Sequence, residues 1–218
     1  MPAKPIHPHA SSPSPRRVCL FGGTFDPVHN AHLRMAIEAR DRFGLDRILF
    51  VPAGHPPHKA DSRVAPYVHR LAMVKLACRG RKGLGASELE NRPGKSFTID
   101  TVRRLRDQLN PADKLFFLIG ADAFDDLTSW HQWREMLPLI EFLVVTRPGH
   151  KYRVPSGARV HSLSGIAMLA SSSGIRSRLA AGQPTPEIPM AVRAYIEEHS
   201  LYGAVKSRYG REGAAVPG

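Results

Sequence analysis

A glycine-rich segment with two histidines carries the first chemical signal in this sequence. It reads GGTFDPVHNAH over residues 22–32 and directly follows the short apolar run Val18–Phe21. Glycines let a backbone approach an anion closely, and the N-terminus of the following helix presents free N–H groups and a positive dipole end. His29 and His32 are three residues apart, so we expect both imidazoles on one face of the first helical turn. The segment therefore predicts a site for phosphate groups.

Other interpretations of this segment explain less of it. The Gly-Lys-Ser/Thr ending of a P-loop is absent, and so is the third glycine of the dinucleotide-binding fingerprint. A histidine pair with this spacing can also bind a metal ion, but no Glu or third ligand stands at a recognisable spacing from it. A single histidine at a helix start is usually a surface residue. Phosphate binding uses both imidazoles and needs no further ligand.

Two other loops contain side chains that could bind anions. Residues 52–59 read PAGHPPHK, in which paired prolines stiffen the chain and leave His58 and Lys59 projecting. A rigid loop that merely faces solvent would look the same. Residues 170–176 read ASSSGIR. Serines before a helix are the usual N-cap, and hydroxyls with free N–H groups and Arg176 one turn into the helix would equally form a second anion site.

Aromatic and polar residues follow the third of the long apolar runs. Residues 120–122 read GAD, and residues 128–133 read TSWHQW. Two tryptophans three residues apart are by default core or helix-packing residues. Thr98, in the stretch SFTIDT, has the simple interpretation of a helix N-cap. On these residues alone, a structural role and a ligand-binding role both remain open.

The elements that must position these loops alternate along the chain. Continuous apolar runs predict buried strands, with a weaker strand around Ala86–Leu89, and apolar residues at helical spacing predict the helices between them. The strong strands are Val18–Phe21, Ile48–Val51, Leu115–Ile119 and Phe142–Val145, and the helices are Ala31–Phe43, Tyr67–Cys78, Thr98–Leu109, a short one ending at Ala180, and Met190–His199. This order predicts an α/β fold, a single doubly wound, Rossmann-like parallel sheet flanked by helices. Ligands of such sheets bind beyond the carboxyl ends of the strands, where the glycine-rich loop would lie.

Charge and composition narrow the class of protein. The chain has 218 residues and a formal net charge of +12. It has only two cysteines, too few for a disulfide framework, and this favours a reducing cytoplasm. We expect a disordered basic arm at 1–16, one domain at 17–203 and a flexible tail at 204–218. Residues 1–17 and 204–218 together carry five of the twelve excess positive charges. No apolar stretch approaches the roughly 20 residues that cross a bilayer, and the oligomeric state cannot be read from the sequence.

Segment 22–32 resembles the signature of the HxGH nucleotidylyltransferases, specifically the bacterial nicotinate-nucleotide adenylyltransferases. The family's glycine before the second histidine is Ala31 here. The stretches PPHK at 56–59, SFTIDT at 96–101, SSSGIR at 171–176 and YIEEHSLY at 195–202 are also similar to motifs of that family. Ser173 and His131 stand where threonine and tyrosine are usual. The ordered motifs cover residues 17–203 and are together far more specific than any one of them.

The resemblance implies a role for each motif. For the catalytic donors it implies His29, His32 and Arg176, and for ATP binding Gly22, Gly23, Thr24, Phe25, Ser172, Ser173 and Ile175. For nicotinate mononucleotide it implies His58, Lys59, Thr98, Gly120, Asp122, Trp130 and His131. Within the second set, His58 and Lys59 would face the mononucleotide phosphate. Trp130 would stack on the pyridine ring, and Thr98 and the backbone of His131 would contact its carboxylate.

The implied reaction is attack of the mononucleotide phosphate on the α-phosphorus of ATP, which releases pyrophosphate and forms deamido-NAD. A phosphate monoester has a second pKa of about 6, so the nucleophile is already ionised at neutral pH and neither a general base nor a covalent intermediate is needed. Mg²⁺ is the expected cofactor, held mainly by the phosphates rather than by a protein metal site. The implied partners are the two small substrates, with no nucleic acid and no membrane.

Two other classes compete with this interpretation. Pantetheine-phosphate adenylyltransferases and cytidylyltransferases share the fold and a His-x-x-His turn, but lack the combination of PPHK, TSW and SSSGIR. A charge of +12 is also typical of nucleic-acid-binding proteins. Against that class, the basic arm and tail do not interleave aromatic residues with their cations, apart from Tyr209.

Overall fold

The computed structural model describes residues 14–54, 64–146, 149, 151–166 and 170–204. Within them, six parallel strands form one sheet in the order β3-β2-β1-β4-β5-β6. The strands are β1 (Arg17–Gly23), β2 (Arg47–Pro52), β3 (Leu84–Ala86), β4 (Lys114–Gly120), β5 (Glu141–Val145) and β6 (Val160–Leu163). The predicted α/β class with a parallel, doubly wound sheet is confirmed.

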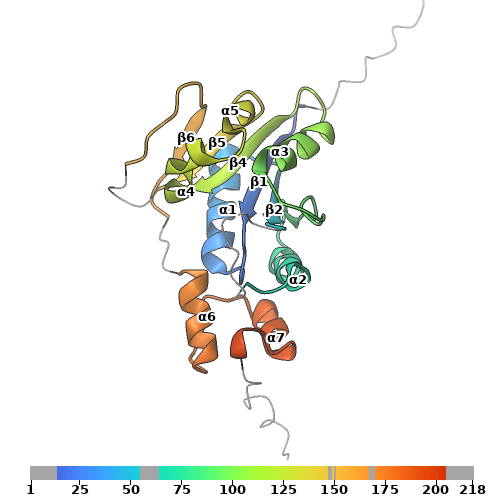
Figure 1. Cartoon of the computed structure of the whole chain (residues 1–218), viewed down its shortest axis with the longest axis vertical. Coiled ribbons are helices and arrows are strands. Elements are labelled where there is room, and N and C mark those ends of the chain that lie inside the picture. The colour runs from blue at the N-terminus through green and yellow to red at the C-terminus, as the bar shows by residue number, and fades with distance from the viewer. Residues whose placement is uncertain (1–13, 55–63, 147–148, 150, 167–169, 205–218) are drawn as a thin grey trace, which may run out of the picture.

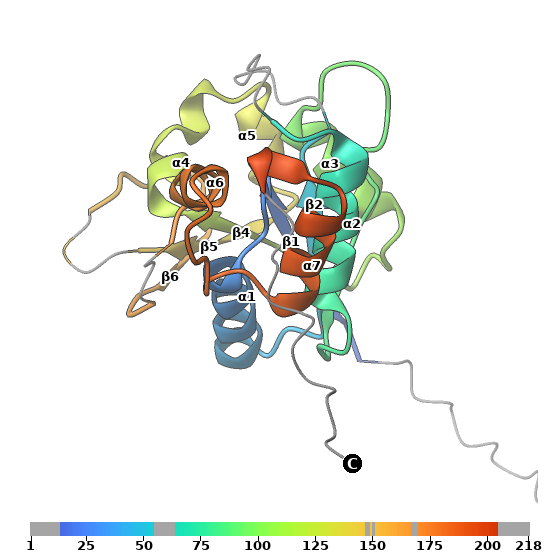
Figure 2. The ribbon, with the colours of Figure 1, turned by 90° about the horizontal axis from the view of Figure 1, so that it is seen from below.

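Helices cover both faces of this sheet. They are α1 (Asn30–Phe43), α2 (Tyr67–Cys78), α3 (Thr98–Asp107), α4 (Ala121–Asp125), α5 (Trp133–Met136), α6 (Ser172–Ala180) and α7 (Met190–Glu198), with 3-10 turns η1 (Leu127–Ser129) and η2 (Leu201–Gly203). One core cluster joins the sheet to α1, α2, α6 and α7, and a second joins it to α3, α4 and α5. Figures 1 and 2 show α6 and α7 side by side at one end of the molecule, with α7 against α2.

The central strand β1 shows why the sheet is buried on both faces. Cys19 and Phe21 point into the first core cluster, and Val18 and Leu20 point into the second. All four side chains are at most 4% exposed. Side chains alternate between the faces of a strand, so a strand between two helix layers must be apolar at every position. The continuous apolar runs of the sequence arise from this arrangement.

The chain reverses its direction of winding next to β1. Strands β2 and β3 lie on one side of β1, and β4, β5 and β6 lie on the other. The connections that leave β1 and β4 therefore diverge, which opens a crevice beyond the carboxyl ends of these strands. The glycine-rich loop follows β1 at this point.

Several element boundaries differ from those expected. Strand β3 covers Leu84–Ala86 rather than Ala86–Leu89, and β6 was not predicted at all. Strand β6 is a four-residue edge strand in which only Leu163 is buried, so its sequence has no continuous apolar run. Arg16, which the sequence placed in the basic arm, donates to Asp113 through its backbone and its guanidinium at 2.7–3.0 Å. Most of the predicted arm and tail (residues 1–13 and 205–218) lies outside the described residues.

The structure also bears on the state of the two cysteines and on the length of the helices. Cys19 and Cys78 are free and buried, which confirms that they are small core residues. In the part of the chain that the structure describes, no helix combines the length and the apolar character that crossing a membrane would require.

The first prediction concerns Gly54, at the start of the connection that leaves β2. A Cβ atom on Gly54 would overlap the Glu90 carbonyl oxygen and lie 2.8 Å from Ser96 Oγ. We expect Gly54→Ala to reduce the free energy of unfolding by about 1–3 kcal/mol, because backbone must move to admit the methyl group. Urea denaturation measures the change. The control is Gly85→Ala, whose Cβ would meet its nearest neighbour at an ordinary 3.5 Å; equal effects of both substitutions would contradict the close packing at Gly54.

Candidate active site

A pocket of about 520 Å³ opens at the carboxyl ends of β1, β2 and β4. Its apolar walls include Phe21, Phe97, Phe117 and Trp130. Trp130 is half-buried and packs edge-to-face on Phe117, with ring centroids 6.1 Å apart. Its default role in packing and a role in the pocket are thus compatible. The walls present several aromatic surfaces, which suits a flat ring as ligand.

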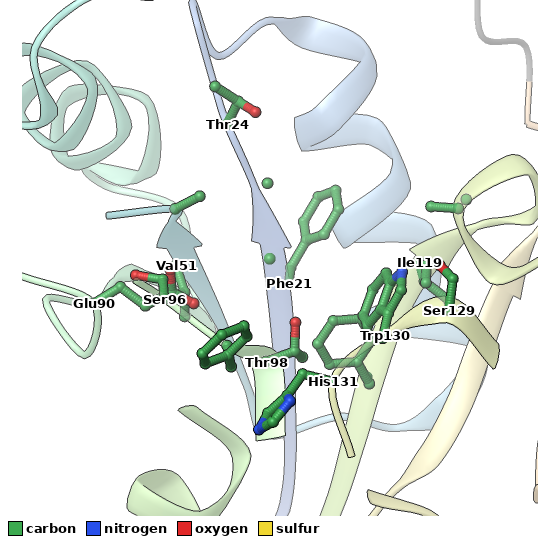
Figure 3. A pocket seen from close by; sticks show the side chains of 17 residues that line it. Phe21, Thr24, Val51, Glu90, Ser96, Thr98, Ile119, Ser129, Trp130 and His131 are labelled. Carbon is green, nitrogen blue, oxygen red and sulfur yellow. The ribbon is translucent and has the colours of Figure 1, made fainter. Parts of the chain in front are cut away.

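Polar groups lie at the margin of the same pocket. Figure 3 shows Thr98, Trp130 and His131 grouped on one side of it, and Glu90 and Ser96 on another. Helix α3 begins at Thr98 with Phe97 as its N-cap residue, so Thr98 is not the cap that its position suggested. The exposed imidazole of His131 packs on the Phe97 ring at 4.3 Å between centroids. A planar ligand would find both apolar walls and hydrogen-bonding edges here.

The glycine-rich loop connects this pocket to α1. Gly22, Gly23 and Thr24 line the pocket, whereas the Phe25 ring is buried beneath Gly23. Phe25 has a φ of +50°, in the left-handed region that most side chains avoid. A Cβ on Gly23 would lie 3.0 Å from the Phe25 ring, so the two residues depend on each other. The backbone of the loop, rather than the side chain of Phe25, faces the pocket.

The two histidines meet at the start of α1. His29 is the N-cap residue rather than part of the first turn, and its backbone N–H donates to His32 Nδ1 at 3.2 Å. The two rings stack with centroids 3.8 Å apart, and His32 also packs edge-on against Phe25. The predicted juxtaposition of the imidazoles is therefore present in the structure. The hydrogen bond from the His29 N–H to His32 Nδ1 and the stacking of the two rings together bring the imidazoles into contact.

Burial makes both imidazoles hard to protonate. Loss of water lowers the pKa of His29 to about 4, although the charge of Glu187 acts to raise it. Burial lowers the pKa of His32 well below its usual range, and the neighbouring His29 lowers it further. Both rings are thus neutral at pH 7 while no anion is near. A bound phosphate would favour their charged forms.

Helix α6 brings a second helix N-terminus against the glycine-rich loop. Ser171 caps it by accepting from the Gly174 N–H at 3.2 Å, and Ser172 Oγ donates to the Pro27 carbonyl at 3.1 Å. Arg176 donates to the Asp26 carbonyl at 2.7 Å and lies 3.5 Å from the Asp26 carboxylate. The N-cap interpretation of the serines therefore holds for Ser171. The N-termini of α1 and α6 converge on the same turn of chain.

The sequence-predicted residues fall into two neighbouring groups and a remainder. Seven of them line the pocket, namely Gly22, Gly23, Thr24, Thr98, Gly120, Trp130 and His131. A second group surrounds the Asp26–Pro27 turn beside it, namely His29, His32, Ser172, Ser173 and Arg176. The side chains of Phe25 and Ile175 belong to the core, and Asp122 is exposed on α4 and is not among the residues that line the pocket. His58 and Lys59 lie outside the described residues.

Sequence reasoning missed the buried guanidinium of Arg70. It donates to the Ala65 carbonyl at 2.9 Å, to the Thr24 carbonyl at 2.9 Å and to the Gly54 carbonyl at 3.4 Å. Gly54 and Ala65 flank the segment that contains PPHK, and Thr24 belongs to the glycine-rich loop. Arg70 therefore holds both ends of the loop after β2 against the glycine-rich loop. Arg70 lies at helical spacing from Met73, Val74 and Ala77, on the apolar face of α2. This spacing was the sequence signal that could have indicated a buried arginine.

Asp26 is a second residue whose role was missed. Its Oδ1 accepts from the Tyr202 hydroxyl at 2.6 Å and from the Ala65 N–H at 3.1 Å. Together with Arg176, these contacts join the glycine-rich loop to the segment just before α2, to α6 and to η2. Nearby, Glu90 accepts from the Gly54 N–H at 3.0 Å and from Thr101 Oγ1 at 2.9 Å. Only their positions in motifs or loops distinguished these residues in the sequence.

Known proteins match the chain over most of its length. A family model described as cytidylyltransferase-like matches residues 20–179. The "Probable nicotinate-nucleotide adenylyltransferase" of Solibacter usitatus is 47% identical over 186 residues, which is 85% of this chain and 99% of that protein. The chain belongs to the nicotinate-nucleotide adenylyltransferase family. A member from Pelobacter propionicus, with the same description, is 39% identical over 85% of this chain and 98% of its own length.

Solved structures of nicotinic acid mononucleotide adenylyltransferase share the fold. The enzyme of Plasmodium falciparum, described as complexed with NaAD, superimposes with a TM-score of 0.70 at 19% identity, over 88% of this chain and all of that chain. A second structure of that enzyme, described as complexed with APC, gives the same TM-score at 18% identity. At this level of identity the likeness supports the architecture. Membership of the nicotinate-nucleotide adenylyltransferase family follows from the bacterial relatives.

The second prediction concerns Arg70. We expect Arg70→Lys to reduce the free energy of unfolding by about 3 kcal/mol, because an ammonium cannot reach three carbonyls and hydrogen bonds to a charged donor contribute about 1.5–3 kcal/mol each. Adenylyltransferase activity should fall in the same variant, since two loops of the site lose their common anchor. Urea denaturation and steady-state kinetics measure the two effects.

The matched control is Arg16→Lys. Arg16 is half-exposed, pairs with Asp113 and lies at the opposite end of β1 from the pocket. We expect this control to leave activity unchanged. An Arg70→Lys enzyme with normal stability and normal kinetics would show that the three contacts are dispensable.

Proposed function

We propose that this chain transfers the adenylyl group of ATP to nicotinate mononucleotide, producing deamido-NAD and pyrophosphate. The observation that carries the proposal is the junction of two sites. An aromatic pocket opens beside a glycine-rich turn, on which the N-termini of α1 and α6 converge. A ring-bearing mononucleotide and the phosphates of ATP would thus be placed side by side. The names of the bacterial relatives support the same substrates.

The pocket suits the pyridine ring of the mononucleotide. In this assignment Trp130 stacks on the ring, and Thr98 with the backbone of His131 binds its carboxylate. Gly120 borders open space, since a Cβ there would meet no atom within 4 Å in the described part of the chain. Asp122 would contact the nucleotide from the turn after β4, and His58 with Lys59 would bind the mononucleotide phosphate from the loop after β2.

The phosphates of ATP are assigned to the second group of residues. The backbone of Gly22, Gly23, Thr24 and Phe25 would lie along the nucleotide, and Ser172, Ser173 and the backbone of Ile175 would bind phosphate oxygens at the α6 N-terminus. His29, His32 and Arg176 would be the donors closest to the reacting phosphates. The pairing of Arg176 with Asp26 at 3.5 Å supports this role, because it holds the guanidinium beside the turn.

The chemistry then consists of alignment and charge stabilisation. A phosphate monoester is ionised at neutral pH, so it can attack the α-phosphorus without a general base or a covalent intermediate. The protein must bring the two reactants into line and neutralise charge on the oxygens of the α-phosphate and leaving pyrophosphate. Donors that are already in position when charge develops act most strongly.

Mg²⁺ fits this site as a companion of ATP. Among the described residues, no three His, Cys, Asp or Glu side chains are grouped as metal ligands. Asp26 is the carboxylate of the glycine-rich turn, and it already accepts from Tyr202 and Ala65. We infer that the ion is held mainly by the phosphates and lowers their negative charge. The free, buried Cys19 and Cys78 agree with a cytoplasmic location.

The third prediction tests the substrate. Pyrophosphate release from MgATP should be rapid with nicotinate mononucleotide, slower in kcat/KM with the amide mononucleotide, and absent with phosphopantetheine. The reason for the first preference is that Thr98 and the His131 backbone would contact the carboxylate of the acid. A coupled pyrophosphate assay compares all three acceptors. Equal kcat/KM for acid and amide would contradict the carboxylate assignment, and activity with phosphopantetheine alone would replace the proposed function.

The fourth prediction concerns His32. We expect His32→Ala to lower kcat by about 100- to 1,000-fold while the protein stays folded, because one preorganised donor to the reacting phosphates is lost. Steady-state kinetics and circular dichroism measure the two properties. The control is His161→Ala, since His161 lies on edge strand β6 and pairs with Glu141 at 2.8 Å. A kcat of His32→Ala within a few-fold of the parent would remove His32 from the reaction.

A further inference from the structure

Several buried side-chain atoms lack hydrogen-bond partners among the described residues, and two of them have complementary chemistry. They are Nδ1 of His29 and Oε2 of Glu187. Such atoms are uncommon in folded proteins, because each loses water without gaining a protein partner. One of them is a nitrogen that can carry a proton, and the other is a carboxylate oxygen that can accept from it. No motif of the sequence includes Glu187.

The backbone around Glu187 is attached directly to the start of α1. Glu187 lies in the connection between α6 and α7, and its carbonyl accepts from the Asn30 N–H at 2.7 Å. Asn30 Nδ2 also donates to the Pro186 carbonyl at 3.3 Å. Asn30 is the residue after His29, so this connection covers the helix end that carries the imidazole. The opposite carboxylate oxygen, Oε1, accepts from Arg178 Nη2 at 2.7 Å.

Charge couples the two residues as well. The bond from Arg178 lowers the pKa of Glu187, so the side chain is a carboxylate at neutral pH. Its charge opposes the effect of burial on the pKa of His29. The other ionisable groups around His29 are His32, stacked on the ring, and the Asp26–Arg176 pair on the loop before it and on α6. Glu187 is the carboxylate whose charge acts on His29 in the described structure.

The chemistry of imidazole limits how both ring nitrogens can be used. A neutral ring has one N–H, so it can donate either to Glu187 or to a phosphate oxygen, but not to both. The imidazolium has two N–H donors. Only this form supplies a proton to the buried carboxylate oxygen through Nδ1 and another to a phosphate through Nε2. The second proton comes from solvent when the anionic substrate binds.

We propose that Glu187 is a positioning residue that holds His29 as an imidazolium when the phosphates are bound. Its carboxylate makes no direct bond to the ring in the described structure; with phosphate bound, Oε2 would accept from Nδ1–H and leave Nε2–H for a phosphate oxygen. The proposal rests on the proposed function, because the phosphate that His29 serves is that of ATP. Arg178 keeps Glu187 charged, and the bond from Asn30 keeps it at the helix end. The connection between α6 and α7 thereby contributes to the reaction through His29 and not through substrate.

The fifth prediction compares Glu187→Gln with the parent and with Glu197→Gln. Glu197 is a matched control, because it is a carboxylate of α7 paired with Arg193 at 2.9 Å and does not act on His29. Removal of the negative charge from Glu187 lowers the pKa of His29, so the imidazolium is lost at a lower pH. If the pKa falls by one unit, kcat should fall about tenfold at the alkaline end of the pH profile, where the charged fraction limits the rate.

The way in which the loss of activity in Glu187→Gln changes with pH separates this role from a merely structural one. The deficit of Glu187→Gln should shrink as the pH falls, since His29 becomes charged in both proteins. Glu187→Asp, which keeps the charge, should restore most of the alkaline activity. A deficit that is the same at every pH, or the same in Glu197→Gln, would overturn the proposal.

Nuclear magnetic resonance provides a readout that does not need turnover. Protein labelled with ¹⁵N-histidine is titrated with MgATP bound, and the His29 signals are assigned from a His29→Gln sample. We expect the imidazolium signals of His29 to persist to higher pH in the parent than in Glu187→Gln. Identical titrations would refute the coupling. If the parent released no pyrophosphate with nicotinate mononucleotide, the proposed function would fail, while this titration would still decide the role of Glu187.

Discussion

Three backbone carbonyls from separate parts of the chain converge on one buried cation, the guanidinium of Arg70. Loop carbonyls cannot pair with one another, and a lysine could not reach all three, so a planar donor with several N–H groups suits this position. The contacts set the distance between the glycine-rich turn and the ends of the loop after β2. The aromatic pocket lies between these segments, and its shape depends on that distance.

Charge in the site is arranged before any substrate arrives. Asp26 holds Arg176 beside the turn, while Tyr202 and Ala65 satisfy the other oxygen of Asp26. The two histidines are buried and neutral, and two helix N-termini face the same turn. A net charge of +12 would by itself suggest a polyanionic partner. The proposed site instead uses a few fixed donors, which suits the concentrated charge of a small nucleotide.

The sequence was sufficient to predict those features that are specified by a local pattern of residues. Buried strands produce apolar runs, and the glycine-rich segment with His29 and His32 contains its own turn and helix start. Edge strand β6 was missed because one buried residue, Leu163, leaves no run. Arg70 and Glu187 were missed for a different reason, since their partners are distant in the sequence. The contacts of Arg70 and the proposed role of Glu187 both depend on tertiary contacts that no spacing along the chain encodes.

The bond between Tyr202 and Asp26 joins residues 176 positions apart. At a synthesis rate of roughly 5–20 residues per second, a ribosome makes Asp26 about 9 to 35 seconds before Tyr202. The sheet strands precede α6, α7 and η2, so the nascent chain contains its glycine-rich turn long before it contains Arg176 and Tyr202, which bind Asp26. The strands of the sheet are therefore synthesised first, and α6 and η2 later supply the side chains that hold the glycine-rich turn in place.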